Sequence, residues 1–263
     1  MTKYLLIDCG YFNFFRYFAA KNWYKLAHTF IDDESMQVDP IFVGTLIKRV
    51  DETILKLLKD HGINRENIVF CRDCRSSDIW RRSILPEYKG TREQKVNVKV
   101  GFSTITDRIE ELCETWGCKM FKHERAEADD LAYLYRRYIL EEVDNEAEFV
   151  VVTSDIDYYQ LCEPNTQLTR LDKRDIMSKS LGDPKKDLLL KIIMGDKSDN
   201  IPSIIKKCGP KKALSLTGDE EALKKLLEEN SEAASQFKKN SLLVDFSNIP
   251  EEIVEEAFAM FKI

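Results

Sequence analysis

The chain has 263 residues, of which 43% are hydrophobic and 33% charged, with a formal net charge of −6. This composition excludes a disordered or fibrous chain, and no apolar run approaches the roughly 20 residues needed to cross a bilayer. The apolar N-terminal stretch is too short for a signal peptide. Seven irregularly spaced cysteines are a poor disulfide framework, and the single CxxC at Cys71 and Cys74 lacks a second pair at zinc-site spacing. We therefore expect a soluble intracellular protein with reduced thiols.

In the first half of the chain, short apolar runs alternate with longer amphipathic ones. Residues 3–7 read as a buried strand, and the aromatic segment 11–18 as a buried helix. Residues 40–60 place apolar side chains at spacings of three and four, which predicts an amphipathic helix. A second strand is expected at 67–71. The segment 75–100 is polar and basic, and Pro86 and Gly90 interrupt any regular pattern in it.

The second half continues this alternation and then becomes helical. Helices are expected at about 102–116 and 127–142, and a third strand at 118–121. Residues 148–153 form the clearest strand, because a continuous apolar run is typical of a parallel sheet covered on both faces. We therefore predict an α/β fold with a mostly parallel central sheet flanked by helices over residues 1–182. A helical C-terminal region would occupy 183–263.

Acidic residues follow each of the four predicted strands. They are Asp8, then Asp73, then Glu127, Asp129 and Asp130, and finally Asp155 and Asp157. One such acid alone is usually a turn former or a helix N-cap. Because the carboxyl ends of parallel strands meet at one edge, where ligands bind, these seven carboxylates should share one crevice. Hard oxygen ligands favour Mg²⁺ or Mn²⁺, and two such ions about 4 Å apart are the usual apparatus for phosphodiester cleavage.

At these residues the chain resembles the 5′-nuclease superfamily, which includes flap endonucleases, the 5′-nuclease domain of bacterial DNA polymerase I, phage 5′-exonucleases and phage ribonuclease H. The resemblance covers about residues 3–215. Residues 195–202 (GDKSDNIP) are similar to the family's GDxSDNxP signature, 127–130 to its EADD motif, and 153–157 (TSDID) to its TxDxD motif. Asp8 and Asp73 resemble its two upstream aspartates, although Cys71 and Arg72 separate Asp73 from its strand. The resemblance implies a PIN-like 5′-nuclease fold.

The resemblance also implies a set of metal ligands and cations. It implies two Mg²⁺ ions, replaceable by Mn²⁺. The first would be held by Asp8, Asp73, Glu127 and Asp129, and the second would be held or surrounded by Asp130, Asp155, Asp157 and Asp199, with Asp196 in support. Residues 75–100 resemble the arch through which a single-stranded 5′ end passes. In that arch Arg81, Lys89 and Arg92 match cations that grip the scissile phosphate.

A DNA-binding element is implied as well, a helix–three-turn–helix at about 190–216. Its phosphate-binding and K⁺-binding hairpin would be formed around Lys206, Lys207, Gly209, Lys211 and Lys212. The family usually has Gly-x-Gly in this hairpin, whereas this chain has Lys207-Cys208-Gly209 and one extra residue before it. Arg16 matches a family arginine that contacts DNA, at a spacing from Asp8 that is one residue longer.

We therefore expect a monomeric, stand-alone structure-selective 5′-nuclease that acts on branched or 5′-ended DNA in replication or repair. A ribonuclease H that removes RNA primers from RNA·DNA hybrids stays open, as does a non-catalytic DNA-binding relative. The net charge does not oppose this, because nine carboxylates would belong to the metal site. A dinucleotide enzyme is excluded, since the first strand is not followed by GxGxxG. No clamp-binding motif is evident, no membrane partner is expected, and the location would be cytoplasmic in a bacterium, phage or cytoplasmic virus.

Overall fold

The centre of the molecule is a five-stranded sheet in which every pair of neighbours is parallel. The computed structural model describes residues 1–28, 32–91 and 97–262. The strands are β1 Lys3–Asp8, β2 Ile68–Arg72, β3 Lys119–Lys122, β4 Glu148–Val152 and β5 Thr166–Thr169. Their order is β3-β2-β1-β4-β5, so the direction of winding reverses between β1 and β4. In open α/β sheets, ligands bind outside the carboxyl ends of the strands at this reversal.

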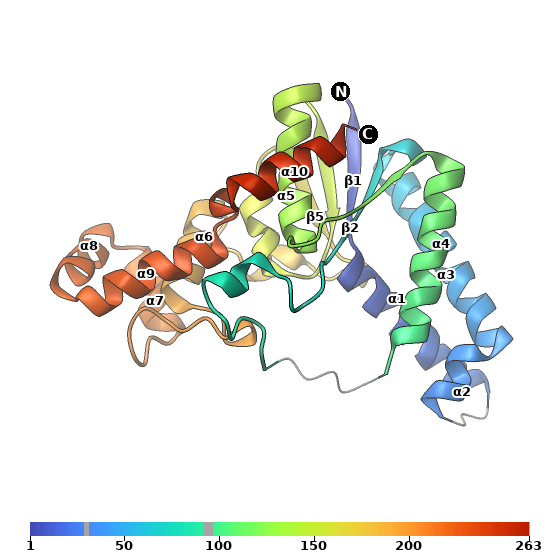
Figure 1. Ribbon diagram of the computed structural model, residues 1–263, viewed down its shortest axis with the longest axis horizontal. Helices are drawn as coiled ribbons and strands as arrows, with labels where there is room; N and C mark the ends of the chain where they lie inside the picture. The colour runs from blue at the N-terminus through green and yellow to red at the C-terminus, as the bar shows by residue number, and fades with distance from the viewer. Residues whose placement is uncertain (29–31, 92–96, 263) are drawn as a thin grey trace.

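Helices cover both faces of the sheet (Figure 1). One face carries α1 Cys9–Ala27, α3 Pro40–His61 and α4 Lys99–Trp116, with the short α2 Asp33–Val38 beside them. The other face carries α5 Ala128–Tyr138 and α10 Glu251–Phe261. Successive side chains of a strand point to opposite faces. Accordingly, Leu5 and Ile7 of β1 pack toward α1 and α3, and Tyr4 and Leu6 pack toward α5. Burial on both sides explains why β1, β2 and β4 read as continuous apolar runs.

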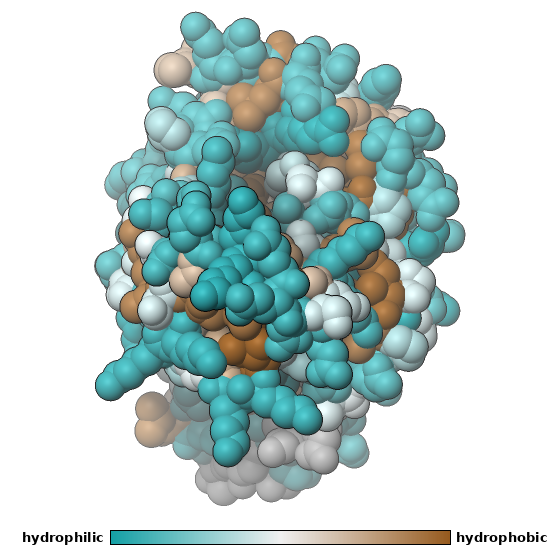
Figure 2. All heavy atoms as spheres, turned by 90° about the vertical axis from the view of Figure 1, so that its left-hand side faces the viewer, coloured by the Kyte–Doolittle hydropathy of each residue, from teal (hydrophilic) through white to brown (hydrophobic). Residues whose placement is uncertain are grey.

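Four further helices form a lobe at one end of the sheet (Figure 1). They are α6 Pro184–Met194, α7 Pro210–Thr217, α8 Glu220–Glu229 and α9 Ser231–Val244. The face that this lobe turns outward is dominated by hydrophilic side chains, with small apolar areas between them (Figure 2). None of the helices in the described part of the chain is long and apolar enough to span a bilayer.

The last helix, α10, returns from this lobe to the α/β core. The ring of Phe261 lies 4.8 Å from that of Phe121 and 5.2 Å from that of Tyr135, centroid to centroid. Ile253 and Ala257 of α10 are fully buried in the same core. The C-terminal helix thus shares the core of the first 182 residues, and the division of the chain at residue 183 stays a prediction.

Two elements and one segment differ from what the sequence pattern indicates. The pattern gave no signal for α2, which is only six residues long, or for β5, a polar edge strand that β4 holds by parallel pairing. The segment before residue 92 is not a solvated loop. Its residues Trp80, Leu85 and Tyr88 are buried, and Leu85 and Tyr88 pack with Ile192 of α6 and Leu243 of α9. Tertiary contacts of this kind have no signature in local periodicity.

Candidate metal centre

A cavity of about 280 Å³ opens at the carboxyl ends of the central strands, where the winding reverses. Its lining includes five of the predicted carboxylates, which come from the segments after four different strands: Asp8, Asp73, Glu127, Asp129 and Asp155. The backbone paths of β1 to β4 thus deliver acids from distant parts of the sequence to one place.

Hydrogen bonds orient the carboxylates from the rim of the sheet. Asp8 caps α1, accepting from the backbone N–H of Tyr11 at 3.1 Å and from the Thr153 hydroxyl at 3.0 Å. Asp73 accepts from the Ala128 N–H at 2.9 Å, and Asp155 from the Asp157 N–H at 3.0 Å. An ionised carboxylate offers about four acceptor sites. Each carboxylate is therefore fixed in place and still has acceptor sites that these hydrogen bonds do not use.

Gly10 allows two of these carboxylates to approach the start of α1. A Cβ atom at this position would lie 3.2 Å from Asp73 Oδ2 and 3.3 Å from Asp8 Oδ1. Contacts this close would push the two oxygens away from the helix. The absence of a side chain at residue 10 therefore shapes the cavity.

The acids of the cavity repel one another. Burial, with Asp73 and Asp155 nearby, raises the pKa of Asp8 to about 7. Burial, followed by the charges of Asp130 and Glu127, raises the pKa of Asp129 well above its usual range. Carboxylates that are difficult to ionise together are stabilised in their charged form by a divalent cation, which binds hard oxygen donors. The residues present therefore fit Mg²⁺ or Mn²⁺.

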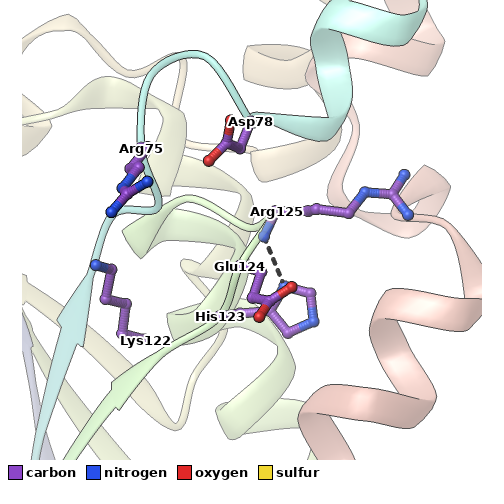
Figure 3. A pocket seen from close by; sticks show the side chains of 6 residues that line it. All are labelled: Arg75, Asp78, Lys122, His123, Glu124 and Arg125. Atoms are coloured by element: carbon purple, nitrogen blue, oxygen red, sulfur yellow. Dashed lines mark hydrogen bonds between the residues drawn. The ribbon is translucent and has the colours of Figure 1, made fainter.

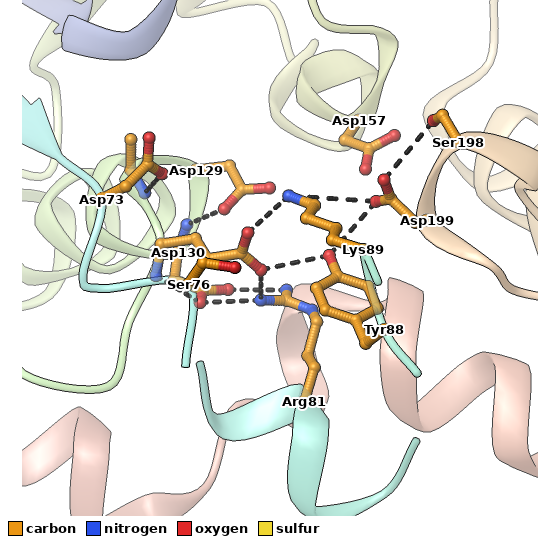
Figure 4. A network of polar contacts seen from close by, with 12 residues as sticks. Asp73, Ser76, Arg81, Tyr88, Lys89, Asp129, Asp130, Asp157, Ser198 and Asp199 are labelled. Carbon is orange, nitrogen blue, oxygen red and sulfur yellow. Dashed lines mark hydrogen bonds and ion pairs between the residues drawn. The ribbon is translucent and has the colours of Figure 1, made fainter. Parts of the chain in front are cut away.

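Arg81 and Asp130 form a buried ion pair behind this cavity (Figure 4). Arg81 is 2% exposed, and its guanidinium donates to both oxygens of Asp130 at 2.7 and 2.8 Å and to Glu127 Oε2 at 3.0 Å. Its Nε donates to the Leu243 carbonyl at 2.7 Å, and Trp80 Nε1 also donates to Asp130. An oxygen of Asp130 lies within 4.8 Å of oxygens of Glu127 and Asp129. Asp130 is absent from the lining of the cavity, and its contacts with Arg81 and with the Glu127 N–H suit the pair to positioning Glu127.

Lys89 reaches the cavity from the same segment as Arg81 (Figure 4). Its ammonium contacts Glu127 Oε1 and lies 3.9 Å from Asp199 Oδ2. The Tyr88 hydroxyl lies 3.1 Å from Glu127 Oε2 and 3.2 Å from Asp199 Oδ2, so it bridges the two acids. Arg92, the third cation expected here, lies outside the described residues.

The loop at residues 195–202 holds this segment against the site. The backbone groups of Asp196 and Ile201 pair with each other at 2.8 and 2.9 Å, and Asn200 Nδ2 donates to the Glu87 carbonyl at 2.8 Å. Gly195 has φ +70°, and a Cβ there would lie 2.4 Å from the Ile201 carbonyl oxygen. In the GDKSDN sequence, Gly195 is therefore required because there is no room for a side chain, and Asn200 joins the loop to the segment before residue 92.

A second acidic cluster, beside the cavity, contains a buried lysine that the sequence analysis did not single out. The Lys191 ammonium, 9% exposed on α6, contacts Asp157 Oδ1 and lies 3.0 Å from Asp196 Oδ2. Burial raises the pKa of Asp196, but Lys191 and hydrogen bonds from Ser198 outweigh it and lower that pKa to about 2. The available signal was a lysine between the apolar runs LLL and IIM, five residues before Asp196.

Asn240 of α9 was also missed, and its neighbours in the sequence give no hint of its role. Its side chain is fully buried and donates to the carbonyls of Ile192 and Pro202, both at 2.8 Å. It thereby joins α9 to both ends of the 195–202 loop.

The lysines and the glycine of the expected DNA-binding hairpin lie outside the metal cavity. Lys206 and Lys207 are exposed, Gly209 is the N-cap of α7, and Lys211 and Lys212 are in its first turn. Lys207 adopts φ +59°, a left-handed conformation that favours glycine and costs other residues about 1 kcal/mol. Lys207 stands where the family pattern has its first glycine, and it adopts the left-handed backbone conformation that glycine favours.

Another cavity, of about 520 Å³, lies at the carboxyl end of β3 (Figure 3). Its cations Arg75, Lys122 and Arg125 are offset by Asp78 and Glu124. The Arg125 guanidinium is turned toward α10, where it pairs with Glu252. His123 Nδ1 accepts from the Arg125 and Ala126 N–H groups, and its Nε2 lies 2.8 Å from Glu256 Oε2. These contacts tie the sheet edge to α10.

The fold and the site together define an α/β protein with a carboxylate cluster suited to divalent cations at its ligand-binding edge. The chain belongs to the family described as 5′-3′ exonuclease, N-terminal resolvase-like domain, whose model matches residues 3–185. The resemblance noted in the sequence is thereby confirmed.

Individual relatives agree with this family. The chain is 29% identical to ribonuclease H of Enterobacteria phage T4 over 71% of its own length and 66% of the relative's. It is 25% identical to DNA polymerase I of Lactococcus lactis over 93% of this chain and 27% of the polymerase. The chain thus spans less than two thirds of either relative. The fold matches the bacteriophage T5 5′-exonuclease with bound zinc, with a TM-score of 0.68 and 18% identity over 99% of this chain and 98% of that one.

Proposed function

We propose that the protein is a structure-selective 5′-nuclease that hydrolyses phosphodiesters of branched or 5′-ended DNA, with flap endonuclease and 5′→3′ exonuclease activity. The observation that carries the proposal is the single cavity that gathers five carboxylates from four strands beside the Lys89 ammonium. This combination suits phosphodiester hydrolysis, because carboxylate-held cations and a lysine can stabilise the negative charge that develops on the phosphate while water attacks.

Two Mg²⁺ ions are the cofactors that this donor set favours. Asp8, Asp73, Glu127 and Asp129 would hold one ion, and Asp155 with the neighbouring Asp157 and Asp199 would hold or surround the other. When bound, such ions activate water and stabilise the leaving oxygen. A bacteriophage T5 flap endonuclease of the same fold, with TM-score 0.67 and 17% identity, has been crystallised with DNA and metal ions, which supports this choice of cofactor and substrate.

The chain itself supplies the groups that orient the substrate. Lys89 is positioned by Glu127 so that its ammonium can pair with a nonbridging oxygen of the scissile phosphate. Phe14 also lines the cavity, and its ring is 58% exposed, so an unpaired base next to that phosphate can stack on it. Residues 75–100, with Arg92, would form the arch that admits the single-stranded 5′ end.

Helices α6 and α7, with the loop between them, would form the helix–three-turn–helix that binds the duplex. Lys206, Lys207, Lys211 and Lys212 are exposed around the N-terminus of α7, where backbone N–H groups and the helix dipole favour phosphate. Gly209 and Lys191 both line a neighbouring cavity of about 630 Å³, which connects this region with the acidic cluster. A K⁺ ion at the hairpin stays part of the proposal.

Cleavage of a 5′-labelled double-flap DNA with Mg²⁺ tests the function. We expect incision at the flap junction by the wild type, its loss in Asp155→Asn, and its retention in the matched control Asp107→Asn, whose carboxylate is exposed on α4 away from the cavity. A wild-type protein that binds the flap but does not cleave it with Mg²⁺ or Mn²⁺ would show a DNA-binding relative without catalysis.

A ribonuclease H that removes RNA primers is the second candidate, favoured by the similarity to the phage T4 ribonuclease H. Carboxylates and cations that engage phosphate are indifferent to the sugar. Competition between an RNA·DNA hybrid and the DNA flap in one reaction separates the two. Preferential cleavage of the RNA strand would assign the protein to primer removal.

A further inference from the structure

A basic cavity of about 300 Å³ lies between α1, α3 and the end of β5, next to the metal cavity. Two carboxylates, Glu52 and Asp60, stand against a larger number of cations in its lining. The cations are Arg16, Arg49, Lys56, Arg170 and Lys173. Such an excess is unexpected in a chain whose net charge is −6.

The two carboxylates are already engaged. Glu52 pairs with Arg49 at 2.9 Å and Asp60 with Lys56 at 2.6 Å, both along α3. Arg170 is held by both oxygens of Asp172. With Asp172 counted, five cations face three carboxylates, so an excess of two positive charges remains in and beside the cavity. Arg16 and Lys173 are in none of these pairs, and the Arg49–Glu52 pair is half-exposed.

Arg16 is the least compensated of these cations. Its Nη1 donates to the neutral hydroxyl of Thr53 at 2.7 Å, and its Nε is buried with no hydrogen-bond partner among the residues that the structure describes. Within that part of the chain no carboxylate oxygen lies within 4.0 Å of its guanidinium. Burial and then the charge of Arg49 lower the pKa of Arg16. The Arg16 guanidinium thus lies near a second arginine and has a donor that is not used. An anion bound between the two would stabilise this arrangement.

The walls of the basic cavity and of the metal cavity are joined by one hydrogen bond. The Leu171 N–H donates to the Tyr11 hydroxyl at 2.9 Å, and Tyr11 lines the metal cavity while Leu171 lines the basic one. Tyr11 and Arg16 are five residues apart on α1, or about 7.5 Å along the helix. One DNA strand carries a phosphate about every 3.4 Å of duplex axis. A nucleic acid engaged in the metal cavity can therefore present another phosphate to the basic one.

We propose that this cavity is a second phosphate-binding site, which takes a phosphate of the bound nucleic acid and fixes its position relative to the metal centre. The inference rests on the proposed function, because it assumes that the ligand is nucleic acid. It extends the DNA-binding role expected for Arg16 to Arg49 and Lys173, which belong to no sequence motif of the family resemblance. Arginine suits the role because its planar fork can bind phosphate through two hydrogen bonds.

Binding, measured separately from cleavage, tests the proposal. Fluorescence anisotropy with a double-flap DNA and Mg²⁺, in the Asp155→Asn background, gives Kd as a function of salt. We expect Arg49→Gln and Lys173→Gln each to raise Kd by about tenfold, as for the loss of one charge-assisted hydrogen bond. Each should also reduce the slope of log K against log salt by about 1.

The matched control is Arg65→Gln, an exposed arginine that stacks on Trp116 and lines neither the basic cavity nor the metal cavity. It should bind like the parent. Unchanged thermal unfolding of all three variants excludes misfolding as the cause. If the Kd and salt slope of Arg49→Gln and Lys173→Gln equal those of Arg65→Gln, the basic cavity is not a phosphate site. Failure of the proposed function would appear separately, as absence of cleavage by the wild type.

The source of the phosphate is identified with modified substrates. Single neutral methylphosphonate linkages, placed in turn along the duplex, should weaken parent binding at one linkage, and Arg49→Gln should lose sensitivity at that same linkage. If parent binding instead depends on whether the substrate ends in a 5′-phosphate or a 5′-hydroxyl, and Arg49→Gln loses that dependence, the site binds the terminal phosphate. If each methylphosphonate linkage weakens binding of Arg49→Gln as much as it weakens binding of the parent, the proposal is wrong.

Discussion

Replacing Arg81 with methionine would separate folding from catalysis in this site. The change removes four hydrogen bonds, three to carboxylates at 2.7 to 3.0 Å and one to the Leu243 carbonyl at 2.7 Å. It leaves the fully buried Asp130 without its cation, whereas Glu127, 2% exposed, keeps Lys89 as its remaining cation. Removing one partner of a buried ion pair costs about 3–5 kcal/mol. We expect a loss of that size in the free energy of unfolding.

Urea unfolding followed by circular dichroism, in EDTA so that metal does not contribute, measures this loss. For a slope of about 3 kcal/mol per M, the midpoint should fall by 1 M or somewhat more. Arg81→Met combined with Asp130→Asn should be more stable than the sum of the single changes by at least about 1 kcal/mol, because the second change removes the unpaired charge. Lys89→Met removes the other cation of Glu127, whose contact with Arg81 remains, so it should cost less stability than Arg81→Met and abolish flap cleavage.

The opposite pattern would refute this assignment. If Arg81→Met unfolds at the wild-type urea concentration yet no longer cleaves DNA, Arg81 acts on the phosphate, as the family resemblance implies, and not on Glu127. Additive effects of Arg81→Met and Asp130→Asn would mean that the ion pair does not stabilise the fold.

Three further predictions concern the metal centre. Lys191→Met leaves Asp157 and Asp196 without their buried cation, so thermal unfolding in EDTA should show a loss of about 3–5 kcal/mol that millimolar Mg²⁺ partly restores. Gly10→Ala brings a Cβ within 3.3 Å of two carboxylates, so half-maximal cleavage should need at least about tenfold more Mg²⁺ at nearly unchanged stability. Asp8 has its pKa raised to about 7 in the folded state from an ordinary value of 3.8, so the folded, metal-free protein holds an extra proton between those values. Its stability should fall as pH rises from 4 to 7, by up to about 1.4 kcal/mol per pH unit, and Asp8→Asn should lack this contribution in urea titrations.

Each of these predictions has a result that contradicts it. Equal stability of Lys191→Met and wild type in EDTA would mean that the two acids are not held by the lysine. An unchanged Mg²⁺ requirement in Gly10→Ala would show that the carboxylates can move at no cost. Identical pH dependence of Asp8→Asn and wild type, both metal-free, would contradict the raised pKa of Asp8 and with it the combined effect of burial and neighbouring charge.

The sequence by itself determined four of the five strands of the described sheet and the edge at which the acids lie. The runs in β1, β2 and β4 are apolar because these strands are buried on both faces, and the acids that follow the strands can only emerge at the carboxyl edge. The alternation of strands and helices predicted the layers for the same reason. The GDKSDN sequence also indicated a specific loop, because glycine and asparagine tolerate positive φ better than other residues. Gly195 and Asn200 do adopt positive φ.

Only the tertiary structure decided which acids face the cavity and which are neutralised behind it. Asp130 and Asp129 are neighbours in one motif, yet Asp130 pairs with Arg81, 49 residues away, and Asp129 lines the cavity. Asp157 pairs with Lys191, 34 residues further along the chain. Local periodicity carries no information about such partners, because the ion pairs form only when separate elements pack together. The same holds for the basic cavity, whose cations come from α1, α3 and the turn after β5.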